Sequence, residues 1–207
     1  MLSSPLTMTS RRHFLSASTA AFAASSFHIF GADPAKKYRT ALIGSGWWGM
    51  NILKEALASG RIKVCALCDV HEDVASNAGD TINGLSGDDP KLYKDYRDLL
   101  DKEKPEIVII ATPDHWHALQ TIAACKAGAH IYVEKPTGHT INESKAMVKA
   151  AREAGVVVQV GLHRRIGPHH VDAMNFLKSG TVGKVGMVRA FVDSKGGRSE
   201  ERRVGKD

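Results

Sequence analysis

The stretch Thr40 to Asn51, with the sequence TALIGSGWWGMN, joins a short apolar run to a segment that can form a helix. A tight strand-to-helix turn needs a residue without a side chain at Gly44, close approach of a pyrophosphate needs one at Gly46, and close helix packing needs one at Gly49. The helix that follows would direct its N–H groups and the positive end of its dipole at the phosphates. The stretch predicts a dinucleotide-binding turn, and a glycine-rich turn without a ligand is the alternative.

Three further residues of the turn are predicted to contact the cofactor: Ser45, Trp47 and Trp48. Two tryptophans in such a turn are unusual. We expect one of the two rings to pack as core and the other to cover the pyrophosphate or the nicotinamide.

Asp69 follows Gly49 by 20 residues and comes directly after an apolar run. Nucleotide-binding units of this kind place an acid here on the ribose hydroxyls. Because an acid at this point repels a 2'-phosphate, the sequence favours NAD over NADP. Asp69 can also serve as the N-cap of a helix over residues 71–80, and the two roles can coexist.

Apolar runs alternate with helical segments along the chain. Strands are predicted at Tyr38–Ile43, Ile62–Leu67, Ile107–Ala111, Ala129–Val133 and Val156–Val160, and helices at Met50–Ser59, His71–Asp80, Tyr93–Asp101, Ala118–Ala127 and Asn142–Glu153, the last capped by Thr140 and Glu143. Residues 80–90 are predicted as a loop. Short links between alternating strands and helices indicate an α/β fold with a doubly wound parallel sheet, a Rossmann fold, over residues 35–162. A helix at Pro168–Leu177 and a strand at Lys184–Val192 predict the start of a second α+β domain over residues 163–193.

The distinctive polar residues follow three of the predicted strands. They are Thr112-Pro113-Asp114-His115-Trp116-His117, then Glu134-Lys135-Pro136, then Gly161-Leu162-His163-Arg164-Arg165. Open α/β sheets bind ligands at the carboxyl ends of their strands. The three loops would therefore bring a base, an acid and cations to one crevice.

The order of these motifs resembles the Gfo/Idh/MocA family, the relatives of glucose–fructose oxidoreductase and inositol dehydrogenase, over residues 38–192. The resemblance rests on GxGxxG, an Asp after the second strand, TPxxxH, EKP, and a Gly followed by Arg-Arg. It implies that Lys135 is the catalytic lysine beside the nicotinamide and that His117 belongs to the catalytic site near it. It also implies that Glu134 and the Thr112-Pro113 backbone line the cofactor, and that Arg164 and Arg165 shape the mouth of the site. Hydride transfer from a carbinol carbon requires loss of the hydroxyl proton, which a lysine can accept or relay.

The resemblance implies an NAD(P)-dependent oxidoreductase that acts on a sugar, a polyol or a related carbohydrate. An NAD-dependent glycosidase of the same family and a fragment that binds nucleotide without turnover are the alternatives. Full-length members continue into a large antiparallel sheet, which often forms the oligomer interface and usually supplies an Asp and a His to the catalytic set. We expect a truncated second domain here and an irregular tail over residues 194–207, so the homo-oligomer expected of full-length relatives is doubtful for this chain.

The first 34 residues resemble a twin-arginine export signal. Ser10-Arg11-Arg12-His13-Phe14-Leu15 precedes an Ala/Ser-rich run to Phe30 that is too polar and too short to span a membrane. The motif predicts export to the periplasm or another extracytoplasmic compartment, and a disordered tail is the alternative.

Composition excludes several other classes of protein. With 43% hydrophobic and 24% charged residues, the 207-residue chain is an ordinary globular protein. The net charge of +6 is partly concentrated near the C-terminus, and without a basic helix interleaved with aromatics it does not predict nucleic-acid binding. Cys65 and Cys68 lie in a predicted strand and should point to opposite faces, so we expect buried free thiols. The histidines lack partners at a recognised metal-ligand spacing, so no metal is predicted.

Overall fold

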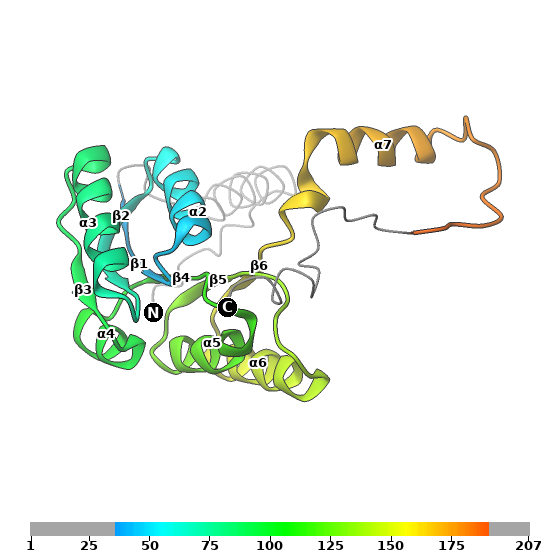
Figure 1. Cartoon of the computed structure of the whole chain (residues 1–207). Coiled ribbons are helices and arrows are strands. Elements are labelled where there is room, and N and C mark those ends of the chain that lie inside the picture. The colour runs from blue at the N-terminus through cyan, green and yellow to red at the C-terminus, as the bar shows by residue number, and fades with distance from the viewer. Residues whose placement is uncertain (1–35, 191–207) are drawn as a thin grey trace, which may run out of the picture. The chain divides into compact units, whose positions relative to one another are not determined.

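A computed structural model of the chain describes residues 36–190 (Figure 1), and along the sequence the chain divides into two compact units between Gly161 and Leu162. The predicted export signal and the predicted tail lie outside the described residues. The strands of the first unit are β1 (Tyr38–Ile43), β2 (Ile62–Cys68), β3 (Lys91–Tyr93), β4 (Ile107–Ile110), β5 (His130–Val133) and β6 (Val158–Val160). Its helices are α2 (Trp47–Ala58), α3 (Glu72–Ser86), α4 (Tyr96–Glu103), α5 (His117–Lys126) and α6 (Ile141–Ala154), with a short 3-10 turn, η1 (Asp114–Trp116).

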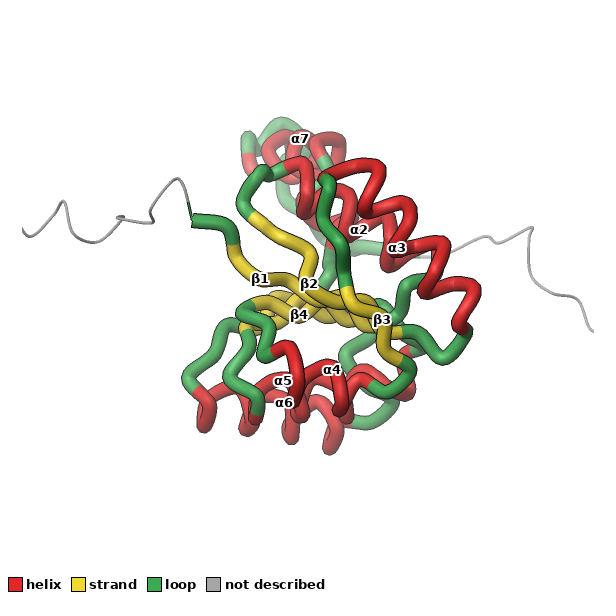
Figure 2. The backbone as a smooth tube through the Cα atoms, turned by 90° about the vertical axis from the view of Figure 1, so that its left-hand side faces the viewer, coloured by secondary structure: helices red, strands yellow, loops and turns green. Residues whose placement is uncertain are grey.

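The strands form one parallel sheet in the order β3-β2-β1-β4-β5-β6. Helices α2 and α3 cover one face of this sheet, and α4, α5 and α6 cover the other (Figure 2). Both faces are therefore buried, which is why the central strands are almost continuously apolar. The predicted doubly wound fold is confirmed. The strand order reverses between β1 and β4, the point at which such sheets bind ligands.

Helix α2 begins three residues earlier than the predicted Met50. Gly46 is its extended N-cap, and the Met50 N–H donates the first helical hydrogen bond to the Gly46 carbonyl at 3.0 Å. The helix therefore starts directly at the glycine turn. This places the N-terminal N–H groups, which have no acceptor within the helix, beside Gly46 rather than one turn away.

Helix α3 runs to Ser86, through residues predicted as a loop. Residues 80–86 are mostly polar, but Ile82 among them is fully buried. It lies on the same face of the helix as the buried Ala75 and Ala78. Burial of that face against the sheet outweighs the weak helix propensity of the Asn and Gly residues nearby. The helix ends at Gly87, whose φ of 72° suits glycine.

The short edge strand β3 was not predicted. Its three residues pair with the second half of β2, and Tyr93, predicted to begin a helix, is the last of them. Helix α4 starts at Tyr96 instead, where the Asp95 side chain accepts a hydrogen bond from the Arg97 N–H at 2.8 Å. Three residues are too few for an alternating pattern to be recognised.

The prediction for the orientation of Cys65 and Cys68 was wrong. Both pack in the same core cluster, because the register between β1 and β2 skips Cys65 in a bulge between Val64 and Ala66. A bulge shifts the alternation of side chains by one position. Cys65 and Cys68 are buried and free, as predicted, and so is Cys125. Burial raises the pKa of the Cys68 thiol to about 12.

The capping pattern predicted for α6 is confirmed. The Glu143 N–H donates to the Thr140 hydroxyl at 3.2 Å, and the Glu143 carboxylate accepts from the Thr140 N–H at 2.9 Å. In the second unit, the 3-10 turn η2 (His163–Ile166) precedes α7 (Pro168–Lys178). Residues 184–190, predicted as part of a strand, form none, since a strand without a pairing partner is not stable. Among residues 36–190, no helix is long and apolar enough to cross a membrane.

Candidate functional site

The three glycines of the turn have different surroundings. Gly44 has a φ of +93°, and a Cβ there would lie 2.8 Å from the Ala111 carbonyl and the Thr112 nitrogen. A Cβ on Gly49 would overlap the Gly44 carbonyl oxygen, whereas a Cβ on Gly46 would meet nothing within 4 Å. Gly44 and Gly49 therefore allow β1, α2 and the end of β4 to pack together. Gly46 leaves open space at the helix N-terminus.

A cavity of about 370 Å³ opens beside this turn, at the carboxyl ends of β1, β2 and β4. Its wall comprises Ile43, Gly44, Gly46, Cys68, Asp69, Val70, Lys94, Asp95, Tyr96, Arg97, Ala111, Thr112, Pro113, Trp116 and Gln120. Its position at the reversal of strand order is that expected for a ligand site. Its volume falls in the range of small-molecule pockets, about 300 to 1,000 Å³.

Asp69 lies on the wall of the cavity and contacts the glycine turn directly. One carboxylate oxygen accepts the Ser45 N–H at 2.9 Å, and the other accepts the His71 N–H at 3.0 Å. His71 itself is the N-cap of α3, so Asp69 supports the start of that helix from two residues before the cap. A carboxylate oxygen can accept two hydrogen bonds. Each oxygen therefore keeps capacity for a hydroxyl of a ligand.

The two tryptophans of the turn differ in exposure. The Trp47 side chain is 77% exposed, whereas Trp48 is half-buried. Their ring centroids lie 5.4 Å apart at an interplanar angle of 44°. Trp47 lines a groove between α2 and α3 with Ser45 and Gly46. Neither tryptophan is fully buried, so the prediction that one ring packs in the core was wrong.

Glu134 directly follows β5, and its buried carboxylate accepts hydrogen bonds from residues on either side of it in the chain. Its two oxygens accept the Tyr132 hydroxyl at 3.2 Å and the Lys135 N–H at 3.1 Å. Burial, followed by the charge of Glu134, raises the pKa of Tyr132 to about 12, so the hydroxyl remains a donor at neutral pH. A Cβ on Gly161, at the end of β6, would overlap Glu134 and lie 2.6 Å from the Tyr132 hydroxyl. The Lys135 side chain itself is exposed.

His117, the first residue of α5, is buried between two loops. Its Nε2 lies 2.9 Å from the Thr112 carbonyl oxygen, and its Nδ1 lies 2.6 Å from the Pro136 carbonyl oxygen. The Thr112 hydroxyl also donates to the Gln120 side-chain oxygen at 2.6 Å. The imidazole therefore contacts both the loop that carries Thr112-Pro113 and the loop that carries Lys135-Pro136.

The structure gathers part of the predicted site around one cavity. Gly44, Gly46, Asp69, Thr112 and Pro113 line it. Ser45, Trp47, Trp48 and Gly49 belong to the adjoining turn, and Glu134, Lys135 and His117 follow the neighbouring strands β5 and β4 without lining the cavity. Arg164 is exposed in η2 of the second unit. The roles assigned to all these residues remain predictions.

Several residues of the site were not predicted. Tyr132 had a signal, because it stands two positions before Glu134 and so shares its face of the strand. The segment Lys94–Arg97 had no recognisable sequence signal. It lies at the cavity because the strand before it, β3, pairs with β2. Short edge strands leave too little pattern for that pairing to be predicted.

The family model of the oxidoreductase family with an NAD-binding Rossmann fold, Gfo/Idh/MocA, matches residues 38–162. Among curated proteins, a glycosyl hydrolase family 109 protein of Stenotrophomonas maltophilia is 36% identical over 155 residues, covering 70% of this chain and 34% of that protein. Levoglucosan dehydrogenase of Pseudarthrobacter phenanthrenivorans is 38% identical over 91 residues, covering 44% of this chain and 23% of that protein. The chain spans about a third of the length of the first curated relatives it matches.

Solved structures of similar fold agree with this match. The myo-inositol 2-dehydrogenase of Lactobacillus plantarum superimposes with a TM-score of 0.65 at 26% identity, over 72% of this chain and 43% of that one. The WlbA dehydrogenase of Bordetella pertussis, solved in complex with NADH and UDP-GlcNAcA, gives a TM-score of 0.62 at 26% identity, over 72% of this chain and 44% of that one.

Proposed function

The chain belongs to the Gfo/Idh/MocA oxidoreductase family, whose members have an NAD-binding Rossmann fold, and we propose that it functions as an NAD(P)-dependent oxidoreductase. The proposed substrate is a sugar, a polyol or a related carbohydrate. The observation that carries the proposal is the cavity at the strand reversal, which has the open Gly46 at one side and the Asp69 carboxylate at another. The dehydrogenase relatives support the class of substrate.

The residues around this cavity fit a dinucleotide. The space at Gly46 lies at the N-terminus of α2, where N–H groups without helical acceptors and the helix dipole favour a pyrophosphate. The remaining acceptor capacity of Asp69 suits the two ribose hydroxyls of NAD, and its charge disfavours a 2'-phosphate. The proposed cofactor is therefore NAD rather than NADP, with Thr112, Pro113 and Glu134 completing its surroundings.

When bound, NAD supplies the acceptor or donor of a hydride. The chain must then supply a group that takes the proton from the substrate hydroxyl, and we assign this role to Lys135. Glu134 and Tyr132 fix the backbone from which Lys135 projects, through hydrogen bonds of 3.1 and 3.2 Å. The family resemblance alone assigns His117, Arg164 and Arg165 to the surroundings of this site.

A second candidate is an NAD-dependent glycosidase of the same family. The similarity to glycosyl hydrolase family 109 proteins supports it, since one such protein is 36% identical to this chain. The two candidates differ in the fate of the cofactor, because a dehydrogenase converts NAD to NADH in net terms and such a glycosidase does not. A third candidate, nucleotide binding without turnover, predicts affinity for NAD and no activity.

We propose in addition that the protein is exported by the twin-arginine route to an extracytoplasmic compartment. The support is the stretch from Ser10 to Leu15 and the Ala/Ser-rich run after it. Replacing Arg11 and Arg12 by Lys should keep a tagged protein inside the cell. Unchanged export of that variant would refute the proposal without touching the enzymatic one.

Binding of NAD and NADH by the purified protein, followed through tryptophan fluorescence, tests the proposed cofactor. Formation of NADH with a panel of sugars and polyols, set beside release of an aglycone from aryl glycosides, separates the first two candidates. A Lys135→Ala variant should bind NAD normally and lose activity by about a hundredfold, the usual contribution of a positioned acid or base. Lys145→Ala, an exposed lysine on α6, is the matched control. Absence of NAD and NADH binding would refute all three candidates, and full activity of Lys135→Ala would refute the mechanism alone.

A further inference from the structure

We infer that His117 is a positioning residue that fixes the loop after β4 against the loop after β5 and thereby sets the place of Lys135 relative to the cofactor. The inference rests on the proposed function, because it concerns the two loops that would hold cofactor and substrate. A catalytic histidine contacts substrate or cofactor, whereas this imidazole contacts the backbone of two loops.

The contacts of the His117 ring are both with backbone. Nε2 reaches the Thr112 carbonyl at 2.9 Å, five residues earlier, and Nδ1 reaches the Pro136 carbonyl at 2.6 Å, 19 residues later. Thr112 lines the cavity, and Pro136 directly follows Lys135. His117 is 1% exposed, and a carbonyl oxygen lies against each of its ring nitrogens. Neither nitrogen can therefore contact a substrate unless its contact with one of the two loop carbonyls is broken.

Imidazole suits this position for a chemical reason. Its two nitrogens point in divergent directions on one rigid ring, so a single side chain can reach carbonyls of two segments. A ring protonated on both nitrogens donates to both carbonyls, and a neutral ring donates to one of them. No aliphatic side chain of similar size can satisfy either carbonyl, and a buried carbonyl without a partner costs free energy.

The same two loops are also joined on their solvent side. His139, four residues after Lys135, lies with its Nε2 2.9 Å from the Asp114 carboxylate in η1. The second loop is in turn attached to α6, because the Glu143 carboxylate accepts the His139 N–H at 2.6 Å. The inner contact through His117 and the outer one through His139 therefore hold the loop after β5 at two points. The inner contact is buried and screened less by water, so we expect it to matter more.

The test compares His117→Leu with Gln120→Leu. Gln120 is also buried, lies on the same helix and contacts Thr112, but within residues 36–190 it makes no hydrogen bond to the loop after β5. In His117→Leu we expect faster amide hydrogen exchange in both loops, residues 112–117 and 134–139, with unchanged exchange in the central strands. The dissociation constant for NADH should rise about tenfold, as for loss of a hydrogen bond in a ligand-binding loop. In Gln120→Leu the loop at 134–139 should exchange as in the wild type.

Three outcomes bear on the inference in different ways. Wild-type protein that does not bind NADH would refute the proposed function. Wild-type binding together with normal exchange at 134–139 and normal affinity in His117→Leu would overturn the positioning role and leave the function intact. Faster exchange throughout the sheet would show general destabilisation and would also count against it.

A second measurement does not depend on a variant with a leucine in the core. The hydrogen bonds of the His117 ring should give a slowly exchanging, downfield imidazole N–H resonance in the wild-type proton spectrum, assigned by its loss in His117→Gln. His117→Gln keeps one donor and should recover part of the NADH affinity lost in His117→Leu. A ring N–H of His117 that exchanges as fast as that of the exposed His115 would overturn the inference.

Discussion

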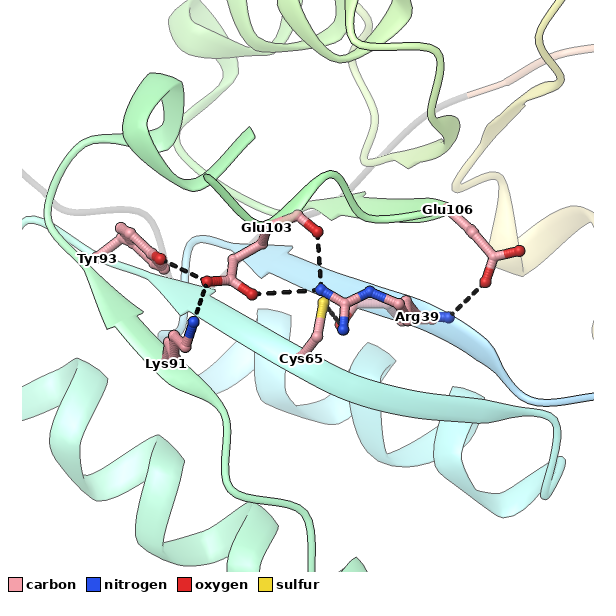
Figure 3. A network of polar contacts seen from close by, with 7 residues as sticks. Arg39, Cys65, Lys91, Tyr93, Glu103 and Glu106 are labelled. Atoms are coloured by element: carbon pink, nitrogen blue, oxygen red, sulfur yellow. Dashed lines mark hydrogen bonds and ion pairs between the residues drawn. The ribbon is translucent and has the colours of Figure 1, made fainter. Parts of the chain in front are cut away.

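Two polar clusters join distant segments of the nucleotide-binding unit, and they differ in how their hydrogen-bonding groups are used. The first, called here the Glu103 network, consists of Arg39, Lys91, Tyr93 and Glu103 (Figure 3). The Glu103 carboxylate accepts the Tyr93 hydroxyl at 2.7 Å, Lys91 at 2.9 Å and Arg39 at 3.3 Å. The second cluster is the candidate site at the carboxyl ends of the strands.

In the Glu103 network the acceptors are occupied by the chain itself. The Arg39 guanidinium also donates to the Glu103 carbonyl at 2.7 Å, and the Arg39 N–H donates to Glu106 at 3.0 Å. At the candidate site, Asp69 accepts two backbone N–H groups and still faces a cavity. A saturated cluster of polar groups stabilises the fold, whereas one with remaining capacity beside open space can bind a ligand. The comparison predicts separable effects on stability and on binding.

The largest effect should come from Gly49→Ala. The new Cβ would overlap the Gly44 carbonyl oxygen, and backbone cannot move away as a flexible side chain can. We expect the free energy of unfolding to fall by about 3 kcal/mol, as in severe overpacking, and NADH binding to weaken with it. Urea unfolding measures the change.

Gly46→Ala is the matched control for this substitution. Its Cβ would meet no atom within 4 Å, so stability should hardly change while NADH affinity falls. Equal losses of stability in the two variants would show that the turn is packed and not open at Gly46.

Glu103→Gln should come next and should act on stability alone. The hydrogen bond from Tyr93, followed by that from Lys91, lowers the pKa of Glu103 below its ordinary value of 4.5. A lowered folded-state pKa adds stability above pH 4.5, and that stability is lost as the pH falls through the folded-state pKa. We expect a loss of about 2 kcal/mol at pH 7, typical of hydrogen bonds to a charged group, with unchanged NADH affinity.

Urea unfolding of wild type and Glu103→Gln at pH 7 and at pH 3 tests the origin of this loss. The difference between the two proteins should shrink at the lower pH. Asp98→Asn, which removes an exposed pair with Lys102 on the same helix, is the control and should change stability little. Weakened NADH binding in Glu103→Gln would break the distinction between the two clusters.

Asp69→Ala should have a smaller effect, chiefly on the choice of cofactor. Removal of the charge should weaken NADH binding about tenfold, as for a hydrogen bond to a charged group, and relax the preference against NADPH. Because Asp69 also accepts the Ser45 and His71 N–H groups, Asp69→Asn is needed beside it to keep the size of the side chain. Titration of both variants with NADH and NADPH gives the ratio of dissociation constants. An unchanged ratio would refute the ribose role.

The smallest effect should come from Asp114→Asn at the exposed contact between the two loops. The hydrogen bond to Asp114 raises the pKa of His139 above its ordinary value of 6.5. A raised folded-state pKa adds stability below pH 6.5, which is lost as the pH rises through the folded-state pKa. Proton NMR titration of the His139 ring should show its pKa returning towards 6.5 in Asp114→Asn. An identical titration curve in the variant would show that the pair does not form in solution.

Much of the fold could be predicted because its signals are local. The Gly44 turn, the alternation of apolar runs and the capping pair of Thr140 and Glu143 depend on residues a few positions apart. The spacing from Gly49 to Asp69 could be used because one helix, α2, and one strand, β2, separate the glycine turn from the acid that contacts it. The continuation of α3 to Ser86 was missed, because burial of Ile82 against the sheet cannot be seen in a polar sequence.

The sequence by itself determined the parallel α/β sheet, the glycine turn and the order of the motifs along the strand ends, because these follow from the period of side chains and the conformations open to glycine. Only the tertiary structure decided the bulge at Cys65, the Glu103 network and the two contacts of His117. Each of these depends on the pairing and packing of segments that are separate in sequence, such as Arg39 with Glu103 or His117 with Pro136. Hydrogen bonds of this kind form only after the sheet has brought those segments together.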